Sequence, residues 1–298
     1  MIINKSNLSS LYTGFNAAFK GAFQAAEVHW PEIAMKVPSS TREEVYGWMG
    51  SFGVIREWIG PRHVNSLSAH SFTITNRDFE ATVAVHRNDI LDDRYGVFKP
   101  VFEEMGYNAR LHPEELVMGL LADGFTAECY DGQPFFDTEH PVTKADGTTE
   151  LVSNMADGSG PAWYLLDTSR AVRPLIFQER EPYTFESKTD LSDDNVFMNN
   201  EFLYGVRARA NVGFGLWQLA YGCKVDLDTA AYAAARAAMM NFKSPEGRRI
   251  GVKPTTLLVP PELEEKALQL LNAQQNASGA SNVWANTAKL IVSPFLSA

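Results

Sequence analysis

The sequence has little cysteine and no long apolar run, and both absences narrow what the protein can be. Its 298 residues include two cysteines, Cys129 and Cys223, which lie too far apart to form a metal-type pair. Such usage suits a reducing compartment with both thiols free. No stretch approaches the roughly 18 apolar residues of a membrane span, and the N-terminal segment lacks the apolar centre of a signal peptide. We therefore expect a protein made and kept in a cytoplasm.

Positive charge is also scarce. The chain carries 26 Lys and Arg against 36 Asp and Glu, a net charge of −10. This balance argues against a protein whose main task is binding nucleic acid through phosphates, although it leaves room for a locally basic patch. Apolar residues make up 45% and charged residues 21%, which is typical of a globular chain, and the length allows one or two domains.

The motifs of common enzymes are missing as well. The chain has no phosphate-binding G-x-x-x-x-G-K-[ST], no G-x-S-x-G elbow and no H-E-x-x-H. One loop gathers reactive residue types: Cys129, Asp131, Asp137, Glu139 and His140. These residues could bind a metal, or Cys129 and His140 could act as nucleophile and base. Their spacing matches no zinc pattern, so we favour a structural loop without metal or cofactor and keep a loop-based metal-dependent or Cys/His hydrolase as the alternative.

A strand followed by a long helix organises the middle of the chain. Phe79, Ala81, Val83 and Val85 alternate with other residues, which predicts a half-buried strand. From 97 to 123 the period changes to steps of three and four, the stripe of an amphipathic helix. The stripe consists of Phe98, Phe102, Met105, Ala109, His112, Leu116 and Leu120. Pro113 should kink this helix near its middle or split it in two.

The two segments before this strand carry apolar residues that need a surface to pack against. Residues 1–40 form an arm with one amphipathic helix, whose apolar face needs a surface in the same chain or in a neighbour. Residues 41–85 predict a hairpin in which Phe72 and Ile74 pair with 79–85 across a turn at 76–78. Large aromatic residues between glycines favour a hairpin that packs outside its own domain, and the alternative is a hairpin that packs on its own core.

The second half is rich in strands and ends in an α/β block. Residues 129–162 read as a long loop with short strands, and 163–222 return to β character with a long run from 196 to 221. Gly205, Gly213 and Gly215 are expected to mark bulges or bends in that run. From 226 onward the pattern predicts a helix over 229–242 capped by Asp228 or Thr229, a strand over 255–260, a helix from 261 and a last strand over 289–296.

Seven segments together resemble the major head (capsid) protein of Mu-like transposable phages and prophages. They are SSTREEVYGWMG (39–50), EWIGPR (57–62), FEATVAVHRNDILDD (79–93), PEELVMGLLADGF (113–125), CYDGQPFFDTEHPV (129–142), WYLLDTSRAVRPLIFQER (163–180) and GVKPTTLLVPPELEEKALQLLN (251–272). Each is weak alone, but they cover nearly the whole chain in order and are specific as a set.

The resemblance implies the α+β capsid fold named after phage Hong Kong ninety-seven. That fold has an N-terminal arm, an extended loop, a peripheral domain on a spine helix, and an axial domain. On this plan 1–40 is the arm, 41–85 the extended loop, 86–128 with 163–225 the peripheral domain, 129–162 the long loop, and 226–298 an axial-domain-like block. Because the last block closes the chain, it would be joined by a rearranged connection.

The function that the resemblance implies is structural. Copies would form hexamers and pentamers of an icosahedral head shell around double-stranded DNA, touched only non-specifically, after assembly in the host bacterial cytoplasm. The expected partners are other copies, a portal, an optional decoration protein and a separate scaffolding protein, since the chain begins directly at the arm. The proposed contacts between subunits are Phe15, Phe19, Trp48, Phe52, Arg56, Trp58, Arg62, Phe72 and Arg77.

One departure from the family plan bears on shell strength. Some capsids of this fold join their subunits by a Lys–Asn isopeptide bond from the extended loop. This chain has no lysine between Lys36 and Lys99, so its loop cannot supply that bond. We therefore expect the shell to depend on apolar burial between subunits, which is worth about 25 cal/mol per Å².

Overall fold

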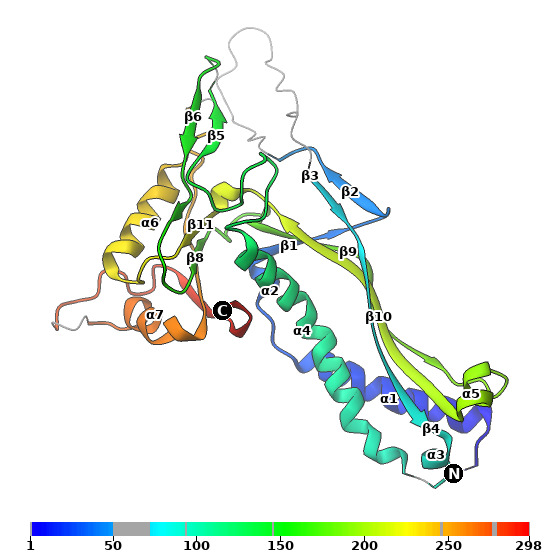
Figure 1. The fold of residues 1–298 in the computed structure, drawn as a ribbon. Helices are drawn as coiled ribbons and strands as arrows, with labels where there is room; N and C mark the ends of the chain where they lie inside the picture. Colours follow the sequence, from blue (N-terminus) through cyan, green and yellow to red (C-terminus); the bar gives the residue numbers. More distant parts are fainter. Residues whose placement is uncertain are drawn as a thin grey trace.

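The computed structural model describes residues 2–49, 72–92, 94–144, 146–244, 247–275 and 279–297. Within these residues, a long four-stranded sheet with two helices along it extends away from a second region that contains a five-stranded sheet and two further helices (Figure 1). The chain has both helices and strands throughout, as predicted for an α+β fold.

The four-stranded sheet is built around two long antiparallel strands, β9 (Leu175–Lys188) and β10 (Glu201–Phe214). β4 (Arg77–His86) pairs antiparallel with β10, and β1 (Ala34–Pro38) pairs parallel with β9, which gives the order β1-β9-β10-β4. The short helix α5 (Asp194–Asn199) occupies the start of the run that the sequence assigned to a strand. The register shifts lie between Arg207 and Ala210 and not at Gly205, where a Cβ would instead come within 2.9 Å of the Ala81 carbonyl oxygen.

Helices α1 (Lys5–Ala25) and α4 (Lys99–Asp123) lie along one face of this sheet (Figure 1). Side chains from both helices and from β4, β9 and β10 form a hydrophobic cluster, here called the arm core. Its members are Leu8, Leu11, Phe15, Phe19, Val85, Ile90, Phe102, Met105, Ala109, Phe185, Val196, Phe202, Tyr204 and Val206. The helices touch at Gly106, where a Cβ would lie 2.2 Å from the backbone oxygen of Phe19. The apolar face of the predicted arm helix is thus covered by other residues of the same chain.

Helix α4 follows α3 (Arg87–Leu91) and a 3-10 turn, η1 (Tyr95–Phe98), and runs on through Pro113 without being split. Its buried stripe agrees with the sequence prediction at Phe102, Met105 and Ala109. Further along, Pro113, Val117 and Leu121 are buried in place of His112, Leu116 and Leu120. Phe102, Met105 and Ala109 pack in the arm core, whereas Val117 and Leu121 pack in a second, larger hydrophobic cluster, so different neighbours set the buried face in the two halves of the helix.

The hairpin predicted between residues 72–75 and 79–85 is wrong. β3 (Phe72–Thr75) pairs antiparallel with β2 (Glu43–Tyr46), and β4 pairs with β10. The residue between β3 and β4, Asn76, is buried, and its side chain bonds Ser39 and Gln178 at 2.8 Å each. Local alternation identified both strands, but it carries no information on which strand each one pairs with.

The second sheet has the order β13-β12-β8-β11-β7. Its strands are β7 (Met155–Ala156), β8 (Trp163–Leu166), β11 (Ala220–Cys223), β12 (Thr256–Val259) and β13 (Lys289–Val292). The C-terminal strands β12 and β13 therefore extend a sheet begun by β8, so residues 226–298 form no sheet of their own. The chain continues past β13 into η4 (Pro294–Leu296), which contacts α4.

Helices α6 (Thr229–Asn241) and α7 (Glu264–Leu271) flank this sheet, with η2 (Trp217–Leu219) and η3 (Pro261–Leu263) as short turns. Asp228, one of the two caps that the sequence allowed, caps α6 by accepting a bond from the Ala231 amide at 2.7 Å. The large cluster here, called the sheet core, includes Phe135, Phe136, Trp163, Tyr164, Trp217, Tyr232, Leu257 and Leu258.

Two smaller features complete the described chain. The predicted loop 129–162 does contain short strands, with β5 (His140–Thr143) and β6 (Thr149–Val152) forming a hairpin. The one-turn helix α2 (Trp30–Ile33) is capped from outside: buried Glu114 of α4 accepts bonds from the His29 and Trp30 amides at 2.8 and 2.7 Å. Among the described residues, no helix is long and apolar enough to cross a membrane.

Candidate functional site

The reactive residue types of the 129–162 loop meet in a buried polar cluster of Cys129, Asp131 and His140. His140 is fully buried, stacked on Trp217 with ring centroids 4.1 Å apart. Its Nδ1 lies 2.8 Å from one Asp131 carboxylate oxygen, and the Cys129 thiol donates to the other oxygen at 3.1 Å. These ligand-type atoms lie within 4.8 Å of one another, so the loop brings together three of the five residues singled out from the sequence.

The bonds around His140 identify the cluster as a buried, hydrogen-bonded Asp–His pair. The amide nitrogen of Asn154 donates to the Phe135 carbonyl at 2.8 Å, so its Oδ1 faces His140 Nε2 at 3.2 Å and must accept from it. Nδ1 in turn faces the Asp131 carboxylate. Burial pushes the pKa of Asp131 up, but the bonds from His140, Cys129 and the Gln133 amide outweigh it and hold that pKa below its usual value.

The same environment suits neither a nucleophile nor a catalytic base. Burial, with the Asp131 carboxylate beside the sulfur, raises the pKa of the Cys129 thiol far above its usual range, so the sulfur stays protonated. Both nitrogens of His140 are already engaged. Asp137 and Glu139 are not part of the cluster, since Asp137 accepts a bond from the Glu139 amide at 2.7 Å within their own turn. The cluster therefore holds parts of the 129–162 loop together and performs no chemistry.

The residues proposed as contacts between subunits fall into three groups. Phe15 and Phe19 are 5% and 3% exposed in the arm core, so the chain itself covers both rings and we do not keep them among the proposed contacts. Trp48 and Phe72 are half-buried at the edge of the sheet core, and Arg77 is exposed with its guanidinium 5.2 Å from the Phe79 ring. Phe52, Arg56, Trp58 and Arg62 lie outside the described residues.

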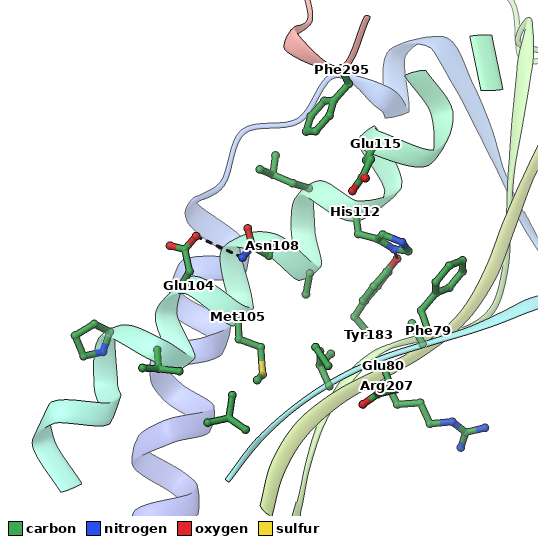
Figure 2. A pocket seen from close by; sticks show the side chains of 18 residues that line it. Phe79, Glu80, Glu104, Met105, Asn108, His112, Glu115, Tyr183, Arg207 and Phe295 are labelled. Carbon is green, nitrogen blue, oxygen red and sulfur yellow. Dashed lines mark hydrogen bonds between the residues drawn. The ribbon is translucent and has the colours of Figure 1, made fainter. Parts of the chain in front are cut away.

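A groove that the sequence did not indicate runs between α4 and the sheet, with a volume of about 910 Å³ (Figure 2). We call it the α4–β4 groove. Apolar side chains line most of it: Phe79, Ala81, Val83, Pro100, Val101, Met105, Ala109, Leu111, Val206, Ala208 and Phe295. Inside it His112 Nδ1 lies 2.5 Å from the Tyr183 hydroxyl. The alternation of β4 and the stripe of α4 were both visible in the sequence, but not that they would face each other with space between them.

Comparison with known proteins identifies the family. The model of the Mu-like prophage major head subunit gpT matches residues 8–296. The major capsid protein of Escherichia phage Mu is 43% identical over 305 residues, which cover 99% of this chain and 100% of that protein. The chain belongs to the Mu-like prophage major head subunits.

Solved structures of assembled particles agree. A chain from the procapsid of bacteriophage JBD30 matches with a TM-score of 0.88 and 42% identity, covering 98% of this chain and 100% of that one. A chain from the JBD30 capsid decorated with minor capsid protein trimers matches with a TM-score of 0.78 and 29% identity over the full length of both.

Family membership confirms several predictions from the sequence. The Mu-like head family, the Hong Kong ninety-seven-like α+β fold and the structural role of a head subunit are all confirmed. Members of this family form capsid shells and are not enzymes, so the hydrolase alternative built on Cys129, Asp137, Glu139 and His140 is not supported.

Proposed function

We propose that this head subunit assembles into hexamers and pentamers that close an icosahedral shell around double-stranded DNA. The observation that carries the proposal is the match over the whole chain to a subunit of a procapsid. A net charge of −10 suits a container that holds DNA without adhering to it. The division into arm (1–40), extended loop (41–85), peripheral domain (86–128 and 163–225), long loop (129–162) and axial-domain-like block (226–298) belongs to this proposal.

The contacts that hold the shell would come from the extended loop. They comprise Trp48, Phe52, Arg56, Trp58, Arg62, Phe72 and Arg77. Because no lysine occurs between Lys36 and Lys99, the loop would work by apolar burial and not by a covalent bond. Purified particles boiled in denaturant should then run as a single monomer band. A ladder of high-mass bands would contradict this.

We propose a separate scaffolding protein, a portal and, by analogy with the decorated JBD30 capsid, a decoration protein as partners. Assembly would take place in the host bacterial cytoplasm. Electron microscopy tests the core of this proposal: the chain should form closed, roughly spherical particles when expressed alone or with its neighbouring genes. Sheets, fibres or soluble monomers in every combination would count against it.

Trp58 offers a sharper test because its ring is the largest apolar group of the loop segment 50–71. Trp58→Ala should lower the yield of particles at least several-fold while leaving the thermal midpoint of the dissociated subunit unchanged. Trp58→Phe, which keeps a ring, should restore most of the yield. Equal loss of assembly and of subunit stability would mean that Trp58 serves the subunit's own fold.

A further inference from the structure

The α4–β4 groove has the size and the walls of a small-molecule site. Its volume of about 910 Å³ is typical of pockets that bind small molecules, and apolar side chains form most of its lining. Three aromatic rings meet inside it: the His112 ring lies 4.4 Å from the Phe79 ring and 5.9 Å from the Tyr183 ring, measured between centroids (Figure 2). Such walls suit a slender apolar chain, and the faces of aromatic rings also attract cations.

The charged groups that line the groove are mostly carboxylates. Glu80, Glu104 and Glu115 belong to the lining, and none of the three has an ion-pair partner among the described residues. Arg207, which also lines the groove, already contacts Glu181 at 3.5 Å. The groove therefore carries excess negative charge beside apolar walls, which favours an occupant that combines positive charge with an apolar body.

Two of these carboxylates share one stripe of α4. Glu104, Asn108, Leu111 and Glu115 follow one another at steps of four, three and four residues, so they lie on the same side of the helix. At 1.5 Å per residue, Glu104 and Glu115 are about 16.5 Å apart along the helix axis, with half-buried Leu111 between them. Carboxylates so far apart cannot hold one compact cation together, but they can bind the two ends of a linear one.

We propose that the α4–β4 groove binds a linear polyamine of the length of spermidine or spermine. Ammonium groups at the two ends of the ligand contact Glu104 and Glu115, and the methylene segments between them lie against Leu111 and the aromatic walls. Glu80 adds negative charge from the β4 side. The site lies within one subunit, so it goes beyond the proposed shell and does not depend on it.

Calorimetry tests the site. Spermine, spermidine and putrescine are each titrated into the full-length chain, kept dilute and unassembled, at about 0.15 M ionic strength, where distant surface charges are screened. We expect one saturable site for spermine and spermidine and at least tenfold weaker binding of putrescine, which is too short to reach both carboxylates. Glu104→Gln/Glu115→Gln should weaken spermine binding at least tenfold. Glu264→Gln/Glu265→Gln removes the same charge from exposed positions of α7 and should bind as the unmodified chain does.

Two further measurements separate a site in the groove from general counter-ion binding. Leu111→Gln keeps every carboxylate but should weaken spermine binding several-fold, because the methylene segments lose an apolar partner. In histidine-selective NMR spectra the signals of His112 should shift as spermine is added, while those of fully buried His140 should not. His112→Phe assigns the shifted signals, and thermal melts establish that all variants are folded.

Several outcomes would overturn the inference. Absence of saturable binding, equal affinity for putrescine and spermine, or equal weakening by the two glutamate pairs would show that polyamines act only as diffuse counter-ions. Unchanged binding to Leu111→Gln, or His112 signals that do not move, would place the ligand outside the groove.

Discussion

The arm core and the sheet core are covered by different kinds of segment. Four of the 14 members of the arm core come from α1: Leu8, Leu11, Phe15 and Phe19. The sheet core instead draws on strands from both halves of the chain, and β8 lies between β11 and β12 and pairs with both. One helix at the N-terminus therefore covers much of one core, whereas no single segment covers the other. The stability of the arm region should thus depend on α1 far more than the stability of the sheet region does.

The largest expected effect is the loss of the α1 rings. Phe15 lies 4.3 Å from the Phe102 ring and 5.2 Å from the Tyr204 ring, measured between centroids. Phe15→Ala and Phe19→Ala should each cost about 3–5 kcal/mol, the usual penalty for a buried phenylalanine. Hydrogen exchange of the double variant should accelerate in β4 and the first half of α4 while β8 and β12 stay protected. Uniform acceleration would show that the two cores unfold together.

The buried Asp131–His140 pair tests the sheet core. Removing one partner of such a pair typically costs about 3–5 kcal/mol, so Asp131→Asn should lower the urea midpoint strongly. Asp137→Asn is the matched control, because the Asp137 carboxylate bonds the Glu139 amide of its own turn and its bonds to Asn154 are made by the backbone, which the substitution keeps. An equal loss for the two variants would contradict a special role for the pair.

The same pair predicts an acid dependence with a defined sign. The pKa of Asp131 is lowered in the fold, so its contribution to stability is present above its unfolded pKa of about 3.9 and is lost as pH falls through the lowered value. The folding stability of the unmodified chain should therefore fall below pH 4 more steeply than that of Asp131→Asn. Parallel pH curves for the two proteins would argue against it.

A smaller effect concerns the helix contact of the arm core. A Cβ at position 106 would meet the Phe19 carbonyl at 2.2 Å, so Gly106→Ala must push α1 and α4 apart and should cost about 1–3 kcal/mol. Gly119 lies in the same helix with nothing within 4 Å of its Cβ position. Gly119→Ala should instead stabilise by about 0.5–1 kcal/mol, the gain from replacing a helical glycine. Thermal midpoints that move in the same direction would refute the contact.

The smallest effect is expected at His112 in the α4–β4 groove. Burial lowers its pKa, with Glu115 opposing the shift and Arg77 adding to it. The unfolded chain then binds the proton more readily than the folded one, so stability should fall slightly as pH drops below the unfolded value of about 6.5. His112→Phe should flatten this part of the curve. A slope that persists in the variant would assign it to another group.

Sequence patterns predicted the structure correctly where it depends on residues close together in the chain or on a single packing face. The cap of α6 at Asp228 depends on residues three apart, and the first half of the α4 stripe on a single packing face. Strand partners were not accessible in this way, because the choice of β2 for β3 is fixed through Asn76 by Ser39 and Gln178, which are distant in sequence. The buried Asp–His pair was accessible only in part: the loop composition indicated Cys129 and His140, but not that Asn154 of the same loop would bond His140. The stacked Trp217 comes from outside the loop.

The ribbon of β9 and β10 passes through both cores. Its Leu175 and Phe214 end belongs to the sheet core, and Phe185 and Phe202 belong to the arm core. Over 14 residues in each strand the ribbon is about 46 Å long, with its ladder bonds perpendicular to its length. A pull along the ribbon is carried by the two strand backbones, whereas a pull that separates the Leu175 and Phe214 ends opens the ladder bonds one at a time. The subunit should therefore be mechanically strong along this one direction and weak across it.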